Sequence, residues 1–291
     1  MPEVLDGAFL GCRESSNLKF ASLAVLGSSR AVLPTPAVRG YEEPGRYFDP
    51  TKLTVEAIVK HCARNYWTRD NHIAMPGDRP YISIFTSEKR PAHSLSDGEM
   101  TMPDMVEYLK AYSAKAFGII PYVAVVCLKA SNAKAMLNRG ADAMTGYAFL
   151  PDFGKPPYVQ DHSQLMEKRA AEWADIQAAI GSSPYVPPVV TGWDASPRGA
   201  NGVKLDDVEG MYPFTPVVEG SSPELLSEMI DRQRTFVMQN VPEGERYTPI
   251  TAWNEVTEGA SLLPRVVDSQ GGMDMSYLDV IRCSKKEVCR V

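Results

Sequence analysis

Short apolar segments alternate with longer amphipathic segments along most of this chain of 291 residues. Six short segments have the length and the β-branched or aromatic content of strands, and each is followed by a helical pattern or a long loop. These predicted strands lie at residues 20–25, 80–86, 119–126, 143–148, 187–191 and 248–253. Repeated strand–helix units are typical of a parallel sheet, because a crossover helix returns the chain to the same starting edge. The sequence therefore predicts an α/β fold.

The segments between these strands carry helix signals. Helices are predicted at residues 54–65, 103–117, 130–139, 162–180, 222–240 and 276–287. Thr54 and Ser222 are placed to cap two of them, and Pro223 fits the first helical position after Ser222. Parallel sheets of this kind either close into a barrel or stay open, and both place the active site at the carboxyl ends of the strands. No glycine-rich nucleotide-binding motif follows any strand, so the open nucleotide-binding sheet has no support.

Composition narrows the class of protein. The chain is 44% hydrophobic and 23% charged, with a net charge of −6, which is ordinary for a globular protein. It has no block of lysine and arginine, which argues against nucleic acid as a partner. No apolar run approaches the roughly 20 residues of a membrane span. No signal peptide is visible, so a cytoplasmic location is expected for the chain as written, and a secreted or periplasmic one if its N-terminus is incomplete.

Cysteine and histidine give no sign of a metal site. The five cysteines are scattered without a CxxC pair, and the four histidines share no metal-type spacing. An odd number of scattered cysteines also favours a reducing compartment over a disulfide framework. The sequence therefore predicts neither a metal nor another cofactor.

The richest chemistry follows the last predicted strand, where residues 248–264 read TPITAWNEVTEGASLLP. Glu255 and Glu258 are three residues apart, and in a helical turn their Cβ atoms would lie roughly 5–6 Å apart on one face. Two carboxylates at such a short distance resist ionising together, so the pKa of one of them should rise, as acid–base chemistry requires. The same spacing also fits an exposed loop with two surface glutamates. Trp253 and Asn254, directly before the pair, favour a binding site.

A second polar motif, VTGWDASPR, follows the predicted strand at residues 187–191. Trp193 offers a flat apolar face, Asp194 an acceptor and Arg198 a rigid set of donors, a combination that suits the apolar faces and hydroxyl rims of sugar rings. Alternatively, Asp194 and Arg198 pair with each other and brace the loop. Tyr147 and Tyr41, the latter in a long loop at residues 27–50, are further candidates for contact with a sugar.

Together these motifs resemble one family. AWNEVTEGASLLPR, the later MSYLDVIR and the earlier VVTGWDASPR are similar to motifs of the glycoside hydrolase family 99-like group. That group also contains the WbsX-like proteins, often labelled as glycosyltransferases of polysaccharide assembly. The resemblance implies a single (β/α)8 barrel domain over residues 1–291 that acts on an oligosaccharide or polysaccharide with α-linked, mannose-type sugars. Because the family usually has two more strands at the start, the barrel is expected to lack its first one or two strands.

The resemblance also implies roles for the two glutamates, which match the paired glutamates of the family motif. Glu255 would act as a base on the neighbouring sugar hydroxyl, giving an epoxide-like intermediate, and Glu258 would protonate the leaving oxygen and later activate water. The net configuration is retained, which agrees with closely paired carboxylates, since about 5–5.5 Å is usual for retaining enzymes. Val256 and Thr257 depart from the family's Trp and His at these positions, which bears on the substrate.

Three functions are therefore weighed: a glycosidase, a glycosyltransferase of surface-polysaccharide synthesis, and a non-catalytic carbohydrate-binding relative. The absence of a clear DxD motif argues against a nucleotide-sugar transferase. For the glycosidase we predict Trp193 and Asp194 in the same cleft as Glu255, with Arg198 bracing Asp194 or another carboxylate. Asn254 is expected to orient one glutamate, and Glu258 to be the one that holds a proton.

Overall fold

The computed structural model describes residues 10–12, 16, 17, 19–26, 51–86, 100–127, 129–147, 150–267 and 271–288. Tyr41 and the whole predicted loop at residues 27–50 lie outside these ranges. Within them, no helix combines the length and the apolar character needed to cross a membrane.

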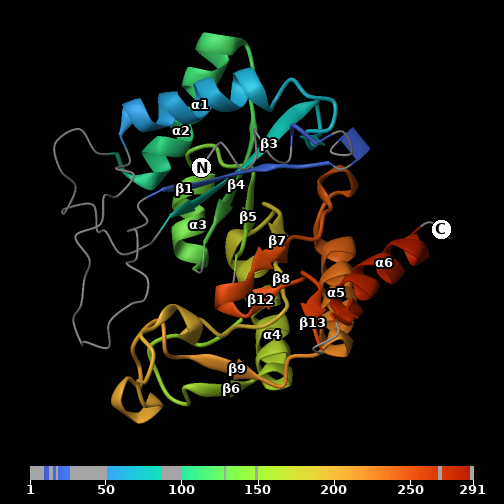
Figure 1. Ribbon diagram of the computed structural model, residues 1–291. Coiled ribbons are helices and arrows are strands. Elements are labelled where there is room, and N and C mark those ends of the chain that lie inside the picture. The colour runs from blue at the N-terminus through green and yellow to red at the C-terminus, as the bar shows by residue number, and fades with distance from the viewer. Residues whose placement is uncertain are drawn as a thin grey trace.

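The core of the fold is a parallel sheet whose strands follow one another in chain order (Figure 1). Its path runs through β1 (Ser22–Leu26), β3 (Arg79–Thr86), β4 (Tyr122–Val126), β5 (Ala143–Thr145) and β7 (Tyr185–Val186), all paired in parallel. β8 (Val189–Val190) follows β7 directly and pairs in parallel with β10 (Ile250–Thr251). This order, in which each strand lies beside the next, is that of a singly wound barrel, whereas an open doubly wound sheet reverses direction at a switch point. The predicted α/β fold with parallel strands is confirmed.

Helices connect the strands, as the parallel pairing requires (Figure 1). They are α1 (Lys52–Asn65), α2 (Met102–Phe117), α3 (Ala130–Leu137), α4 (His162–Ile180), α5 (Pro223–Asn240) and α6 (Ser276–Val288). α1 to α5 each lie between two successive strands of the parallel order, and α6 follows the last. Shorter strands flank this frame: β2 (Ala74–Met75), β6 (Val159–Asp161), β9 (Val217–Glu219), β11 (Asn254–Glu255), β12 (Ala260–Ser261), β13 (Arg265–Val266) and β14 (Met273–Asp274).

Residues of the central strands alternate between two apolar layers, because successive side chains of a strand point to opposite faces. Ile82 and Val123 belong to the main core cluster with residues of the helices, whereas Tyr81 and Tyr122 belong to a smaller cluster that also contains Ala143. Every residue of β4 is buried, as expected for a strand covered on both faces. The near-continuous apolar run in the sequence thus predicted this central strand correctly.

Element boundaries differ from the prediction in several places. The strand predicted at residues 187–191 begins earlier and is divided into β7 and β8, and the strand predicted at residues 248–253 is reduced to the two residues of β10. β4 begins at Tyr122, later than expected, and β5 ends at Thr145, so that Tyr147 lies in the following loop. α1 begins one turn earlier than predicted, since Thr51 is its N-cap and accepts a hydrogen bond from the backbone N–H of Thr54 at 3.2 Å. Ser222 caps α5 as predicted, with Pro223 in the first turn.

Replacing the Thr51 cap with alanine is expected to destabilise the protein by about 1 kcal/mol, because the N–H of Thr54 loses its acceptor. The midpoint of urea unfolding should fall while the slope stays unchanged. Leu53→Ala, at a side chain that is 78% exposed in the same turn, is the matched control and should leave the midpoint nearly unchanged. Equal midpoints for wild type and Thr51→Ala would contradict the assigned cap.

Candidate functional site

Glu255 and Glu258 lie just beyond the carboxyl end of β10. There the chain forms a short antiparallel hairpin of β11 and β12, in which Glu255 pairs with Ala260. A 3₁₀ turn of residues Val256–Glu258 and then Gly259, with φ of +62°, connect the two strands. The predicted helical turn is therefore a 3₁₀ turn, which still carries both glutamates. This position is where (β/α) barrels place their active sites.

The loop after β8 packs directly against this hairpin. The backbone N–H of Asp194 donates to the carbonyl of Glu258 at 2.7 Å, and a Cβ atom on Gly192 would lie only 3.2 Å from the carbonyl of Gly259. Glycine at position 192 is what allows this close approach of two backbones. The two motifs singled out in the sequence therefore meet in space, at the ends of the paired strands β8 and β10.

Arg198, in a 3₁₀ turn of residues Ser196–Arg198, contacts both glutamates. Its Nη1 donates to Oε1 of Glu258 at 2.5 Å, and its Nη2 to Oε2 of Glu255 at 3.1 Å. Its Nε donates to the hydroxyl of Thr257 at 3.0 Å, and Nη1 also donates to the hydroxyl of Tyr212 at 3.0 Å. One guanidinium group thus joins the two carboxylates.

The sequence left open whether Arg198 pairs with Asp194. In the structure, Arg198 pairs with the two glutamates instead. Asp194 instead uses Oδ1 to accept a hydrogen bond from the backbone N–H of Ser196 at 2.9 Å. That bond fixes the turn that carries Arg198. Arg198 thus braces other carboxylates, which is the second arrangement predicted above.

The two glutamates have different surroundings. The side chain of Glu258 is 11% exposed and that of Glu255 is 33% exposed. Burial raises the pKa of Glu258, the charge of Arg198 opposes this rise and the charge of Glu255 adds to it, so that the pKa lies above its ordinary value. The direction agrees with the prediction that Glu258 is the residue that holds a proton.

Tyr147 lies in the same electrostatic environment. Burial, together with the charges of Glu255 and Glu258, raises its pKa to about 12, although Arg198 acts in the opposite direction. Its ring stacks on Phe85 with centroids 5.6 Å apart. The phenol therefore stays protonated at neutral pH and is able to donate a hydrogen bond near the carboxylate pair.

The two tryptophans near the site are placed differently. The side chain of Trp253 is 59% exposed, whereas Trp193 is 7% exposed and packs edge-on against Phe153 at 5.4 Å. Phe153 itself is 46% exposed. The structure describes Asn254 only through its backbone, which pairs with Ser261. Sugar contacts by Trp253, Trp193 and Asn254 thus stay predictions, and an open face is available at Trp253.

Sequence reasoning missed the contacts of three side chains around the site. Thr257 and Tyr212 hold Arg198, and Phe153 covers Trp193. Thr257 could have been found from its place between the two glutamates. Neither Tyr212 nor Phe153 belongs to a recognisable motif, and each reaches the site only through the tertiary fold.

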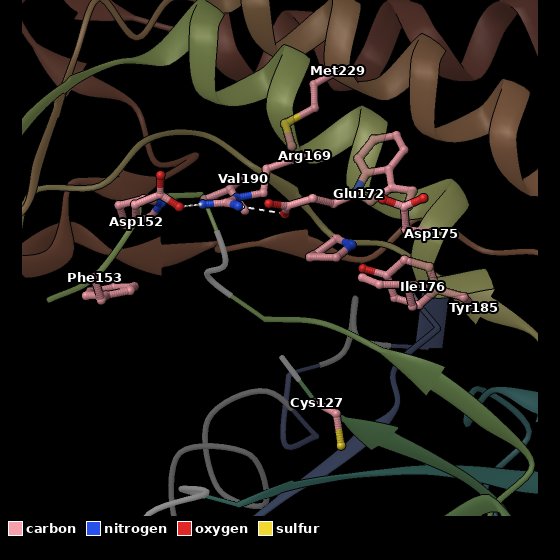
Figure 2. A pocket seen from close by; sticks show the side chains of 13 residues that line it. Cys127, Asp152, Phe153, Arg169, Glu172, Asp175, Ile176, Tyr185, Val190 and Met229 are labelled. Atoms are coloured by element: carbon pink, nitrogen blue, oxygen red, sulfur yellow. Dashed lines mark hydrogen bonds and ion pairs between the residues drawn. The ribbon is translucent and has the colours of Figure 1, made fainter. Parts of the chain in front are cut away.

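A cavity of about 430 Å³ lies beside this region, between α4 and strands β7 and β8 (Figure 2). Trp173, Tyr185 and Val190 form part of its wall, and Glu255 and Glu258 do not line it. Figure 2 shows Arg169 between Asp152 and Glu172, and it pairs with them at 2.7 and 2.6 Å. These charged groups of the cavity satisfy one another, so the carboxylate pair on Arg198 is the better candidate site.

In the part of the chain that the structure describes, no three or more His, Cys, Asp or Glu side chains gather as a metal site would require.

Comparison with known proteins finds similarity in structure. The endo-α-mannosidase of glycoside hydrolase family 99 from Bacteroides thetaiotaomicron matches with a TM-score of 0.53 and 12% identity, over 96% of this chain and 69% of that chain. Its structure in complex with bis-tris propane matches with a TM-score of 0.52 and 14% identity, over 94% and 70% of the two chains. No protein-family model and no curated protein matches the sequence.

The chain is similar in fold to glycoside hydrolase family 99. The resemblance predicted from the sequence motifs is confirmed at this level. Because fold alone does not fix activity, the function has to be argued from the site itself.

Proposed function

We propose that this chain is a glycoside hydrolase that cleaves α-linked, mannose-type glycans with Glu255 and Glu258 as its catalytic pair. The observation that carries the proposal is the meeting of these two carboxylates on the guanidinium of Arg198, at the carboxyl end of β10. One of them is buried and the other is one-third exposed. Carboxylates in unlike environments have different pKa values, and this difference separates an acid from a base.

In the proposed mechanism, Glu255 removes the proton from the sugar hydroxyl next to the anomeric carbon. The resulting oxygen attacks that carbon, while Glu258 gives its proton to the departing glycosidic oxygen. Glu258, now ionised, then takes a proton from water as the water oxygen opens the epoxide-like ring, and Glu255 returns its proton to the released oxygen of that ring, which becomes the sugar hydroxyl again. Two successive displacements at the same carbon leave its configuration unchanged.

Substrate contacts are proposed for the candidates named from the sequence, which are Trp253, Asn254, Trp193, Asp194, Arg198, Tyr147 and Tyr41. Of these, Tyr147 has the most specific proposed role, which is to donate a hydrogen bond from its phenol. The charges of both carboxylates act on this phenol, and it stays neutral. A neutral donor there suits a sugar hydroxyl.

Incubation with a panel of α-mannosides and related oligosaccharides, analysed for both free sugar and new glycosides, tests the proposal. Hydrolysis of at least one member is the expected result. Transfer to an acceptor without hydrolysis would support the glycosyltransferase, and binding without turnover would support the carbohydrate-binding relative. Either of these two results would overturn the proposed hydrolase.

A further inference from the structure

The guanidinium of Arg198 is engaged almost completely by protein groups. It has five N–H donors, and its four contacts to Glu258, Glu255, Thr257 and Tyr212 use most of them. A residue built to recognise a ligand would keep more of its donors free. Arg198 is therefore placed to act on the glutamates, and a role as the main ligand contact is secondary.

The pairing of Arg198 with Glu258 affects how readily the Glu258 carboxyl group holds a proton. A guanidinium stays charged at all accessible pH values, so a carboxylate at 2.5 Å from it is stabilised in its ionised form. A general acid, in contrast, needs its proton. Arg198 is closer to the buried Glu258 than to the more exposed Glu255, at 2.5 against 3.1 Å. The stronger contact is thus made with the proposed acid.

The other polar groups around Glu258 come from several elements. Glu255 of β11 adds negative charge, and Tyr147, after β5, is neutral. The hydroxyl of Tyr212 accepts a hydrogen bond from Arg198. Asp194, after β8, contributes its backbone N–H to the carbonyl of Glu258, and its Oδ1 binds Ser196. Arg198 is the cation that contacts the carboxylate pair in the part of the chain that the structure describes.

We infer that Arg198 is a positioning residue that binds both glutamates at once and favours the ionised form of Glu258 against the effects of burial and of Glu255. The inference rests on the proposed function for the meaning of the pair, but the ion pair itself is testable without a substrate. Burial and the charge of Glu255 both favour the protonated form of Glu258, and Arg198 opposes them. Once Arg198 is removed, burial and the charge of Glu255 favour the protonated form of Glu258 without opposition.

The experiment is a ¹³C NMR titration of the side-chain carboxyl groups of protein labelled with δ-¹³C glutamate, with the Glu258 signal assigned by its loss in Glu258→Gln. In Arg198→Met the apparent pKa of Glu258 should lie about 1–3 pH units above that of the wild type, since this is the usual effect of a contacting cation. Arg198→Lys keeps the charge and should restore most of the difference. Because the two glutamates interact, the signals of both are followed.

Arg232→Met is the matched control. Arg232 also joins two glutamates, Glu167 and Glu228, but on the surface of α4 and α5, so its removal should leave the Glu258 titration unchanged. An unchanged or lowered Glu258 pKa in Arg198→Met would overturn the inference. If that variant does not fold, Arg198→Gln, which keeps donors without charge, takes its place with the same expected rise. An unchanged Glu258 pKa in the Arg198 variant would leave the hydrolase proposal standing. An inactive wild type would, in turn, leave the titration result standing.

Discussion

Glu255→Gln and Glu258→Gln are each expected to lower the turnover of any glycoside that the wild type cleaves by about 10²–10⁴-fold, the usual contribution of a positioned acid or base. Glutamine keeps the size and shape of the side chain but neither takes up nor gives a proton at the pH of the assay. The measurement is the rate of sugar release at saturating substrate for the wild type and the two variants. Wild-type rates in both variants would exclude the pair as the catalytic groups.

Loss of folding has to be separated from loss of chemistry in these variants. Since the pKa of Glu258 is raised in the folded protein, the native state binds the proton more tightly than the unfolded chain does. This contribution to stability is present below the ordinary carboxyl pKa and is lost as the pH rises through the raised pKa of the folded state. Glu258→Gln should remove that part of the pH dependence of unfolding while the variant stays folded. A cooperative urea transition at each pH is the check.

Gly259→Ala is expected to destabilise the protein by about 1–3 kcal/mol and to lower activity as well. Gly259 has φ of +62°, a region in which residues with a Cβ atom are strained. A Cβ atom there would also lie 2.8 Å from the backbone nitrogen of Asp194. The neighbour is backbone and has little freedom to yield, so the loops that place Glu258 and Arg198 have to separate. Urea unfolding and sugar release measure the two effects.

Gly202→Ala separates the strain from the close approach. Gly202 has φ of +78°, but no described atom lies within 4 Å of the position its Cβ would take. This control should therefore show the loss of stability that comes from φ alone, with activity unchanged. If Gly259→Ala were no worse than Gly202→Ala in either measurement, the proposed tight contact between the two loops would be wrong.

The sequence predicted the parallel frame well because the frame depends on local patterns. The apolar run of β4 and the Ser222–Pro223 start of α5 each specify their element within a few residues. Boundaries were less certain where two signals compete. Thr51 and Thr54 are both good N-caps, and the structure uses the earlier one. β5 stops at Thr145 because Gly146 follows, a residue that weakens a strand.

The site was predictable in part. The closeness of Glu255 to Glu258 follows from their separation of three residues, and the resemblance in sequence motifs assigned them roles. The contact of Arg198 with both joins residues 57 and 60 positions apart in the chain, and so depends on β8 and β10 lying side by side. The edge-on contact of Trp193 with Phe153 likewise depends on the tertiary fold, because no local pattern connects these two residues.

The central claim, a retaining glycosidase built on this carboxylate pair, is tested most directly by following a cleaved α-mannoside by ¹H NMR. The anomeric signal of the first product reports the configuration before mutarotation sets in. The proposed mechanism predicts that the α-anomer forms first with the wild type, and that its signal is lost in both Glu255→Gln and Glu258→Gln. A β-anomer formed first, or no cleavage of any α-mannoside by the intact chain, would contradict it.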